Sequence, residues 1–204
     1  MLLSWDDSRR AFSDAADWFV RTAALVGDRW TEFGLGEWDV RALVGHTSRS
    51  LLTVETYLAR PAALVEVASA TEYFRATKAA AADPAVAVRG WEAGAALGTD
   101  PAAAVAQIAG RVLPLVDART GTELVTTIAG GMRLSDYLPT RTFELAVHTA
   151  DLATALGLPP EVPATAATQA LHIVTELAVA EGLAGRLLLS ATGRPGFPAG
   201  FSVL

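Results

Sequence analysis

One segment, residues 133–157, constrains the fold of this chain most strongly, because it joins a continuous helical pattern to a row of groups able to do chemistry. Positions separated by alternating steps of four and three residues lie on one face of an α-helix. In this segment those positions are Tyr137, Arg141, Glu144, His148 and Asp151. Bulky apolar residues bracket the row, whereas the charges of an ordinary surface helix lie opposite its bulky residues. We therefore predict a helix whose polar row looks into a pocket inside the protein.

The same row has a second interpretation. A charged row on a solvated face is the commoner meaning of such a pattern, with Arg141, Glu144 and His148 joined in pairs three and four residues apart. The helix alone favours this solvated face. A second histidine in a suitable position elsewhere in the chain would reverse the balance.

The composition of the remaining chain favours closely packed helices. The chain has 204 residues, of which 51% are hydrophobic and only 7% aromatic, and alanine is abundant. Strands would need more β-branched and aromatic residues. We predict an all-α fold with one domain over residues 1–185, followed by a tail over residues 186–204 that is too short to form a separate domain.

Apolar periodicity predicts the other helices. They are expected over residues 6–26, 40–59, 62–82, 84–97, 101–116 and 164–184. Asp39 is the expected N-cap of the second of these helices, which must end before Pro61. The regular part of the central helix is expected to begin near Leu138, because Pro139 is best tolerated in a first turn.

Other segments predict little regular structure. Residues 31–36 are expected to form a loop, residues 123–128 are the one convincing β-like run, and the tail contains a short strand-like stretch, LLLSA. No chemistry is expected in residues 61–98.

Composition and charge exclude several classes of function. The absence of cysteine excludes disulfides, thiolate metal sites and a protein thiol nucleophile. The formal net charge of -6 and the lack of a Lys/Arg cluster argue against a nucleic-acid partner. No signal-peptide core and no apolar run of membrane-spanning length is evident, so we expect a soluble cytoplasmic protein without a membrane partner.

A second histidine does occur, in the second turn of the helix predicted over residues 40–59. Taken alone, His46 would be a core or surface residue, as we also expect for His172. With Glu144 and His148, however, it makes a set of two imidazoles and one carboxylate. This set suits Zn²⁺ or another divalent first-row metal and leaves a coordination position for water or substrate.

Two stretches of the sequence resemble a known family. GEWDVRALVGHT and YLPTRTFELAVHTADLATALG are similar to the signature stretches of the mycothiol-dependent maleylpyruvate isomerases, within the DinB-like superfamily of metal-binding four-helix bundles. The resemblance covers roughly residues 8–158. It implies a four-helix bundle whose metal, usually zinc, is bound by His46, Glu144 and His148.

The resemblance also implies a reaction class, in which mycothiol or a similar small thiol binds as thiolate near the metal and adds to an electrophilic substrate. Arg141 would pair with a substrate carboxylate or hold Glu144, and Asp151 would orient His148, although a structural ion pair is an equal alternative for both. The isomerase itself has a further C-terminal domain that helps to form its site. Only a short tail is expected here, so the resemblance supports the metal site in this chain more strongly than it supports the isomerisation reaction.

The leading hypothesis is a zinc-dependent enzyme that uses a small thiol to modify or isomerise an electrophile. The alternatives are a non-catalytic bundle that binds a metal or small ligand, and a metal-assisted hydrolase. Helix faces made of small residues would suit a homodimer, but no interface can be read from the sequence.

Overall fold

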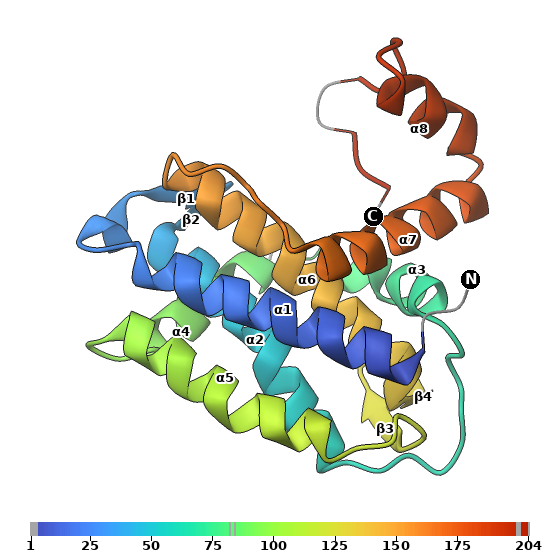
Figure 1. The fold of residues 1–204 in the computed structure, drawn as a ribbon, viewed down its shortest axis with the longest axis horizontal. Helices are drawn as coiled ribbons and strands as arrows, with labels where there is room; N and C mark the ends of the chain where they lie inside the picture. The colour runs from blue at the N-terminus through green and yellow to red at the C-terminus, as the bar shows by residue number, and fades with distance from the viewer. Residues whose placement is uncertain (1–3, 82, 84, 199–200, 204) are drawn as a thin grey trace.

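Four long helices form the centre of the molecule, whose computed structural model describes residues 4–81, 83, 85–198 and 201–203 (Figure 1). They are α1 (Trp5–Ala24), α2 (Val40–Leu58), α5 (Pro101–Asp117) and α6 (Leu134–Ala155). Both α1 and α2 pack against α5 and against α6, so the four enclose a common core. Its fully buried side chains include Phe12, Phe19, Leu43, Leu51, Leu138, Leu145 and Leu152. The prediction of an all-α helical bundle is therefore confirmed.

The start of α2 is fixed by the residue that the sequence indicates. Asp39 has an extended backbone, and its carboxylate accepts a hydrogen bond of 2.7 Å from the backbone N–H of Ala42. Such an N-cap satisfies a donor that the first turn of a helix otherwise leaves unpaired. Asp39 also belongs to β2 (Trp38–Asp39), which pairs with β1 (Phe33–Leu35). The loop predicted over residues 31–36 thus contains a short strand, preceded by a 3₁₀ turn, Arg29–Thr31.

The central helix begins earlier than predicted. The β-like run is confirmed as β3 (Leu124–Thr127), which pairs with β4 (Gly130–Arg133), and α6 follows directly at Leu134. The hairpin orients the chain for the helix, so Pro139 lies inside α6 and not at its start. The prediction of a start near Leu138 was wrong, because the first residue of the helix is set by the end of the hairpin and not by the proline.

The helix predicted over residues 62–82 is shorter in the structure, where α3 spans Ala70–Ala81. Before it, the chain runs in irregular form along the hairpin, with an antiparallel bridge between Pro61 and Val125. The backbone N–H groups of Glu66 and Val67 both donate to the carbonyl of Gly131, at 2.8 and 3.1 Å. These contacts with the hairpin replace the helical bonds that the local sequence would favour. The next helix, α4 (Ala85–Ala96), follows Pro84, which lies outside the described residues.

Two helices follow the bundle. α7 (Ala164–Ala180) packs on α1 and α6, and α8 (Ala184–Ala191) extends away from them (Figure 1). The strand-like LLLSA stretch of the tail therefore lies in a helix, and that prediction was wrong. Leucine and alanine favour a helix where no neighbouring strand is present to pair with, and the described part of the chain offers none here. Among the described residues, no helix is both long enough and apolar enough to cross a lipid bilayer.

Candidate metal centre

The polar row of α6 runs from the core of the protein to its edge. Tyr137 is fully buried and Arg141 is 8% exposed. The side chains of Glu144, His148 and Asp151 are 22%, 18% and 30% exposed. Tyr137 and Arg141 therefore lie in the interior, as predicted for the row, whereas its other three residues are partly exposed at the edge of the protein. Of the pairs in the second interpretation, His148 with Glu144 forms, at 3.3 Å and on a partly exposed part of the helix, whereas no ion pair of Arg141 with Glu144 forms among the described residues.

The fold brings His46 of α2 to Glu144 and His148 of α6. One ligand atom from each of the three residues lies within 4.8 Å of the other two. The rings of His46 and His148 meet edge to face, with centroids 4.9 Å apart. Ligands that lie about 2.1 Å from one zinc ion are at most about 4.2 Å apart, so a small side-chain movement would let these three share an ion.

The state of His46 suits a metal ligand. Its Nδ1 atom is buried and has no hydrogen-bond partner, which is uncommon for a polar atom in a protein interior. Burial, together with the nearby charge of His148, lowers the pKa of His46 to about 4. The imidazole is therefore neutral at neutral pH and keeps a lone pair for an ion. The two nitrogens and one carboxylate oxygen of the cluster are the donors that divalent first-row metals accept.

Glu144 and His148 form a charged pair. Although burial opposes the charged form of each, the hydrogen bond from His148 and the charge of Arg141 lower the pKa of Glu144 to about 2. The hydrogen bonds to Asp151 and Glu144 raise the pKa of His148 to about 9. The Nε2 atom of His148 lies 3.3 Å from Glu144 Oε2. A proton thus holds the pair together, and an ion entering the site would have to displace it.

Asp151 contacts the opposite side of the same imidazole. Its Oδ2 atom lies 3.1 Å from the Nδ1 atom of His148. A carboxylate in this position keeps a proton on Nδ1 and fixes the ring orientation, so that Nε2 is left for an ion. The spacing of three residues along α6 therefore does bring Asp151 into contact with His148.

Arg141 is buried without a carboxylate within ion-pair distance in the part of the chain that the structure describes. Its Nε atom donates to the hydroxyl of Thr140 at 3.0 Å, and its Nη2 atom donates to the hydroxyl of Tyr73 at 3.4 Å. The guanidinium lies 5.3 Å from the ring centroid of Tyr73 and 5.1 Å from that of Tyr137. No hydrogen bond joins Arg141 to Glu144 among the described residues, so Arg141 acts on Glu144 through its charge.

Tyr73 was missed by the sequence analysis, which expected no chemistry in residues 61–98. It lies on α3 and is 5% exposed, and its ring also meets that of Tyr137. The only signal in the sequence was a pair of adjacent aromatic residues, Tyr73 and Phe74, in an alanine-rich helix. That pattern indicates burial but gives no information on which charged residue the hydroxyl meets.

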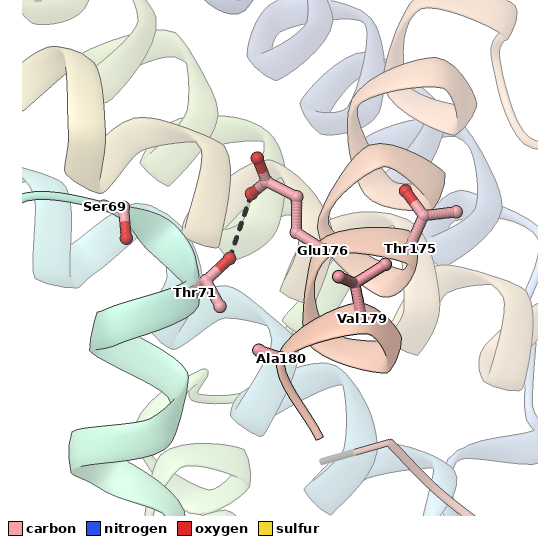
Figure 2. Close-up of a pocket in the computed structure, with 6 residues that line it drawn as sticks. All are labelled: Ser69, Thr71, Thr175, Glu176, Val179 and Ala180. Carbon is pink, nitrogen blue, oxygen red and sulfur yellow. Dashed lines mark hydrogen bonds between the residues drawn. The ribbon is translucent and has the colours of Figure 1, made fainter. Parts of the chain in front are cut away.

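The third histidine lies outside this cluster. His172 forms a pair with Glu176 at 3.2 Å on the outer part of α7, where both side chains are about 40% exposed. Glu176 also accepts a hydrogen bond of 2.9 Å from Thr71 across a hollow between α3 and α7 (Figure 2). The hollow is lined by Ser69, Thr71, Thr175, Glu176, Val179 and Ala180. One carboxylate and three hydroxyls, each of which already has a hydrogen-bond partner, do not make a metal site, so His172 is a surface residue, as expected.

Comparison with known proteins gives a match to a protein family. The family model described as the mycothiol maleylpyruvate isomerase N-terminal domain matches residues 10–153. That range includes all three residues of the cluster and ends two residues beyond Asp151. No curated protein and no solved structure matches the chain.

Proposed function

The chain belongs to the mycothiol maleylpyruvate isomerase N-terminal domain family, and from this premise we propose that it is a zinc-dependent enzyme that uses a small external thiol to modify or isomerise an electrophile. The observation that carries the proposal is the meeting of His46, Glu144 and His148, whose ligand atoms lie within 4.8 Å of one another. Three protein ligands, with a further position for substrate, are the usual arrangement of a catalytic zinc site.

A thiol co-substrate accounts for the chemistry that the chain lacks. A divalent ion in this site would favour the deprotonated form of a thiol at neutral pH. The sequence contains no cysteine, so any sulfur nucleophile must come from outside the chain. The family description itself refers to mycothiol, which is a molecule of this class.

In this proposal Asp151 and Arg141 support the reaction without binding the metal. Asp151 holds the imidazole of His148 through its 3.1 Å contact with Nδ1. Arg141 is a buried cation whose charge no carboxylate of the described chain neutralises at close range, and buried charges are normally paired. We assign it to an anionic group of the thiol or of the electrophile, with Tyr73 and Tyr137 keeping the guanidinium in place.

The metal site is tested by measuring the metal content of protein purified without added metal. His46→Ala and Glu144→Ala are each expected to abolish stoichiometric zinc. His172→Ala is the matched control, because His172 forms a similar pair with a glutamate one turn away but has no third ligand among the residues that the structure describes. Undiminished metal in both cluster variants would eliminate the site.

The thiol reaction is tested separately, by adding mycothiol and a panel of electrophiles to the zinc-loaded protein. Thiol consumption that depends on the metal, together with a shift in the absorption spectrum of the Co²⁺-substituted protein when mycothiol is added, is the expected result. A protein that binds zinc at the cluster but gives neither signal would be a non-catalytic metal-binding bundle. Hydrolysis of the electrophile without the thiol would instead indicate a metal-assisted hydrolase.

A further inference from the structure

The imidazole of His46 must be held by packing, because no hydrogen bond from a described residue reaches either of its nitrogens. Ligand histidines usually have their second ring nitrogen fixed by a hydrogen bond, as Asp151 fixes that of His148. At His46 the nearest comparable contact is an aromatic one. The indole ring of Trp38 lies against the imidazole, with centroids 4.4 Å apart and an angle of 33° between the ring planes.

Trp38 is in turn held by α4. Its Nε1 atom donates a hydrogen bond of 3.0 Å to the backbone carbonyl of Ala87. One turn further along α4 lies Gly90, where an added Cβ atom would be only 2.4 Å from the Cε2 and Nε1 atoms of the indole. Real Cβ atoms do not approach other atoms so closely. The indole therefore packs directly on the backbone of α4, in space that only glycine leaves open.

The same helix lies in backbone contact with α2 next to His46. A Cβ atom at Gly45, the residue before His46, would lie 2.1 Å from the backbone nitrogen of Gly94 in α4. A Cβ atom at Gly94 would lie 2.8 Å from the carbonyl of Arg41. The Nε atom of Arg41 also donates to the carbonyl of Gly94 at 2.9 Å. Contacts with α4 thus fix both the backbone beside His46 and the indole against its ring.

We propose that Trp38 is the positioning residue for the first metal ligand, and that Gly90 keeps its indole in contact with the imidazole of His46. This inference rests on the proposed function, because a positioned ligand matters only if His46 binds a metal. Trp38 itself contacts neither metal nor substrate in this account. Trp38 restricts the rotation of the His46 side chain before an ion binds. Less conformational entropy is therefore lost on binding.

The first test measures zinc affinity by competition with a chelator. Gly90→Ala is expected to weaken zinc binding about tenfold or more, the usual cost of losing a group that orients a metal ligand. It should also change the absorption bands of bound Co²⁺, which report ligand geometry. Gly110→Ala is the matched control, since an added Cβ atom there, in α5, meets nothing within 4 Å. Equal zinc affinity in Gly90→Ala and the wild type would overturn the inference.

A double-mutant cycle separates the proposed contact from a general disturbance of α4. Trp38→Ala alone should weaken zinc binding, and adding Gly90→Ala to it should have no further effect, because the new methyl group then has no indole to displace. If Gly90→Ala weakens binding equally in both backgrounds, its effect does not pass through Trp38 and the inference is wrong. Should Gly90→Ala fail to fold, Trp38→Phe provides the comparison: a smaller ring should lower the affinity less than Trp38→Ala does.

A measurement on the metal-free protein keeps this inference distinct from the proposed function. The imidazole protons of His46 should show a ring-current shift from the indole in the proton NMR spectrum, and His46→Ala assigns them by their disappearance. Gly90→Ala should remove that shift, and Gly110→Ala should keep it. An unchanged shift in Gly90→Ala would refute the inference even if zinc binds. Wild-type protein that shows the shift but binds no zinc would refute the proposed function instead.

Discussion

The proton between His148 and Glu144 makes zinc binding depend on pH. Since hydrogen bonds to Asp151 and Glu144 raise the pKa of His148 to about 9, the ring is protonated at pH 7 and must release its proton to an entering ion. We expect zinc affinity to rise about tenfold per pH unit between pH 7 and 9 and to level off above pH 9. Competition with a chelator across this range measures the dependence.

Asp151→Asn provides the comparison for this prediction. A neutral amide supports the imidazolium less well than a carboxylate, so the pKa of His148 should fall and zinc affinity should level off at a lower pH. Calorimetry in buffers of different ionisation enthalpy should show less proton release at pH 7 than in the wild type. An affinity that does not change between pH 7 and 9 in the wild type would contradict the protonated pair.

Arg141 can be replaced without loss of stability if its role is functional. A buried guanidinium with no carboxylate beside it is costly to desolvate, and methionine fills a similar volume without that cost. We expect Arg141→Met to leave the free energy of unfolding of the metal-free protein unchanged or to raise it, as measured in a denaturant titration. Its thiol-transfer activity should nevertheless fall sharply.

Arg111→Met is a control for this measurement, because Arg111 forms an exposed two-point pair with Glu55 at 2.7 and 3.0 Å. Loss of such a surface pair should change the free energy of unfolding by at most about 1 kcal/mol. A loss of more than about 2 kcal/mol in Arg141→Met would mean that the packing of Arg141 on Tyr73 and Tyr137 is structural.

At the scale of elements, the contact between residues 61–69 and the β3–β4 hairpin determines where α3 and α6 begin. Gly131 lies at the centre of this contact. Its N–H donates to Glu66 Oε2 at 2.7 Å, and an added Cβ atom would lie 2.1 Å from the carbonyl oxygen of Leu64. We expect Gly131→Ala to lower the free energy of unfolding by about 2 kcal/mol or more, because backbone must move to admit the methyl group.

Gly110→Ala is again the control, and its expected change in the free energy of unfolding has the opposite sign. Its helical position is open, so alanine should stabilise the protein by about 0.5–1 kcal/mol through its higher helix propensity. Denaturant titrations of the two variants measure both effects. A Gly131→Ala variant as stable as the wild type would mean that the hairpin does not hold this segment in place.

The same contact shows why the sequence predicts some elements and not others. α2 could be placed closely, because its N-cap and its apolar spacing are local signals. The irregular, non-helical form of residues 61–69 could not be predicted, since it depends on backbone bonds to a hairpin far along the chain. The strand predicted for the LLLSA stretch was wrong because its apolar run suits either a strand or a helix. It forms a helix because no strand among the described residues is available to pair with it.

For the molecule as a whole, the three residues of the cluster could be proposed from the sequence because two of them share one helix turn and the third belongs to a recognisable stretch. The groups around them could not be, because Trp38, Tyr73 and Gly90 reach the site only through the packing of α3 and α4 on the bundle. Their sequence context indicates burial, but burial does not identify the neighbour.

The cluster also links parts of the chain that are far apart, so an ion bound there should stabilise the whole fold. His46 belongs to α2, and Glu144 and His148 belong to α6, which packs against it across the core. A ligand that binds only the folded state stabilises it by about 2.7 kcal/mol at one hundred times its Kd. For a chain of this size we therefore expect zinc at that concentration to raise the Tm by about 5–10 °C in calorimetry, and a chelator to reverse the rise. His46→Ala should remove the shift while His172→Ala retains it, because a shift that survived in His46→Ala would come from zinc bound elsewhere and not from a link between α2 and α6.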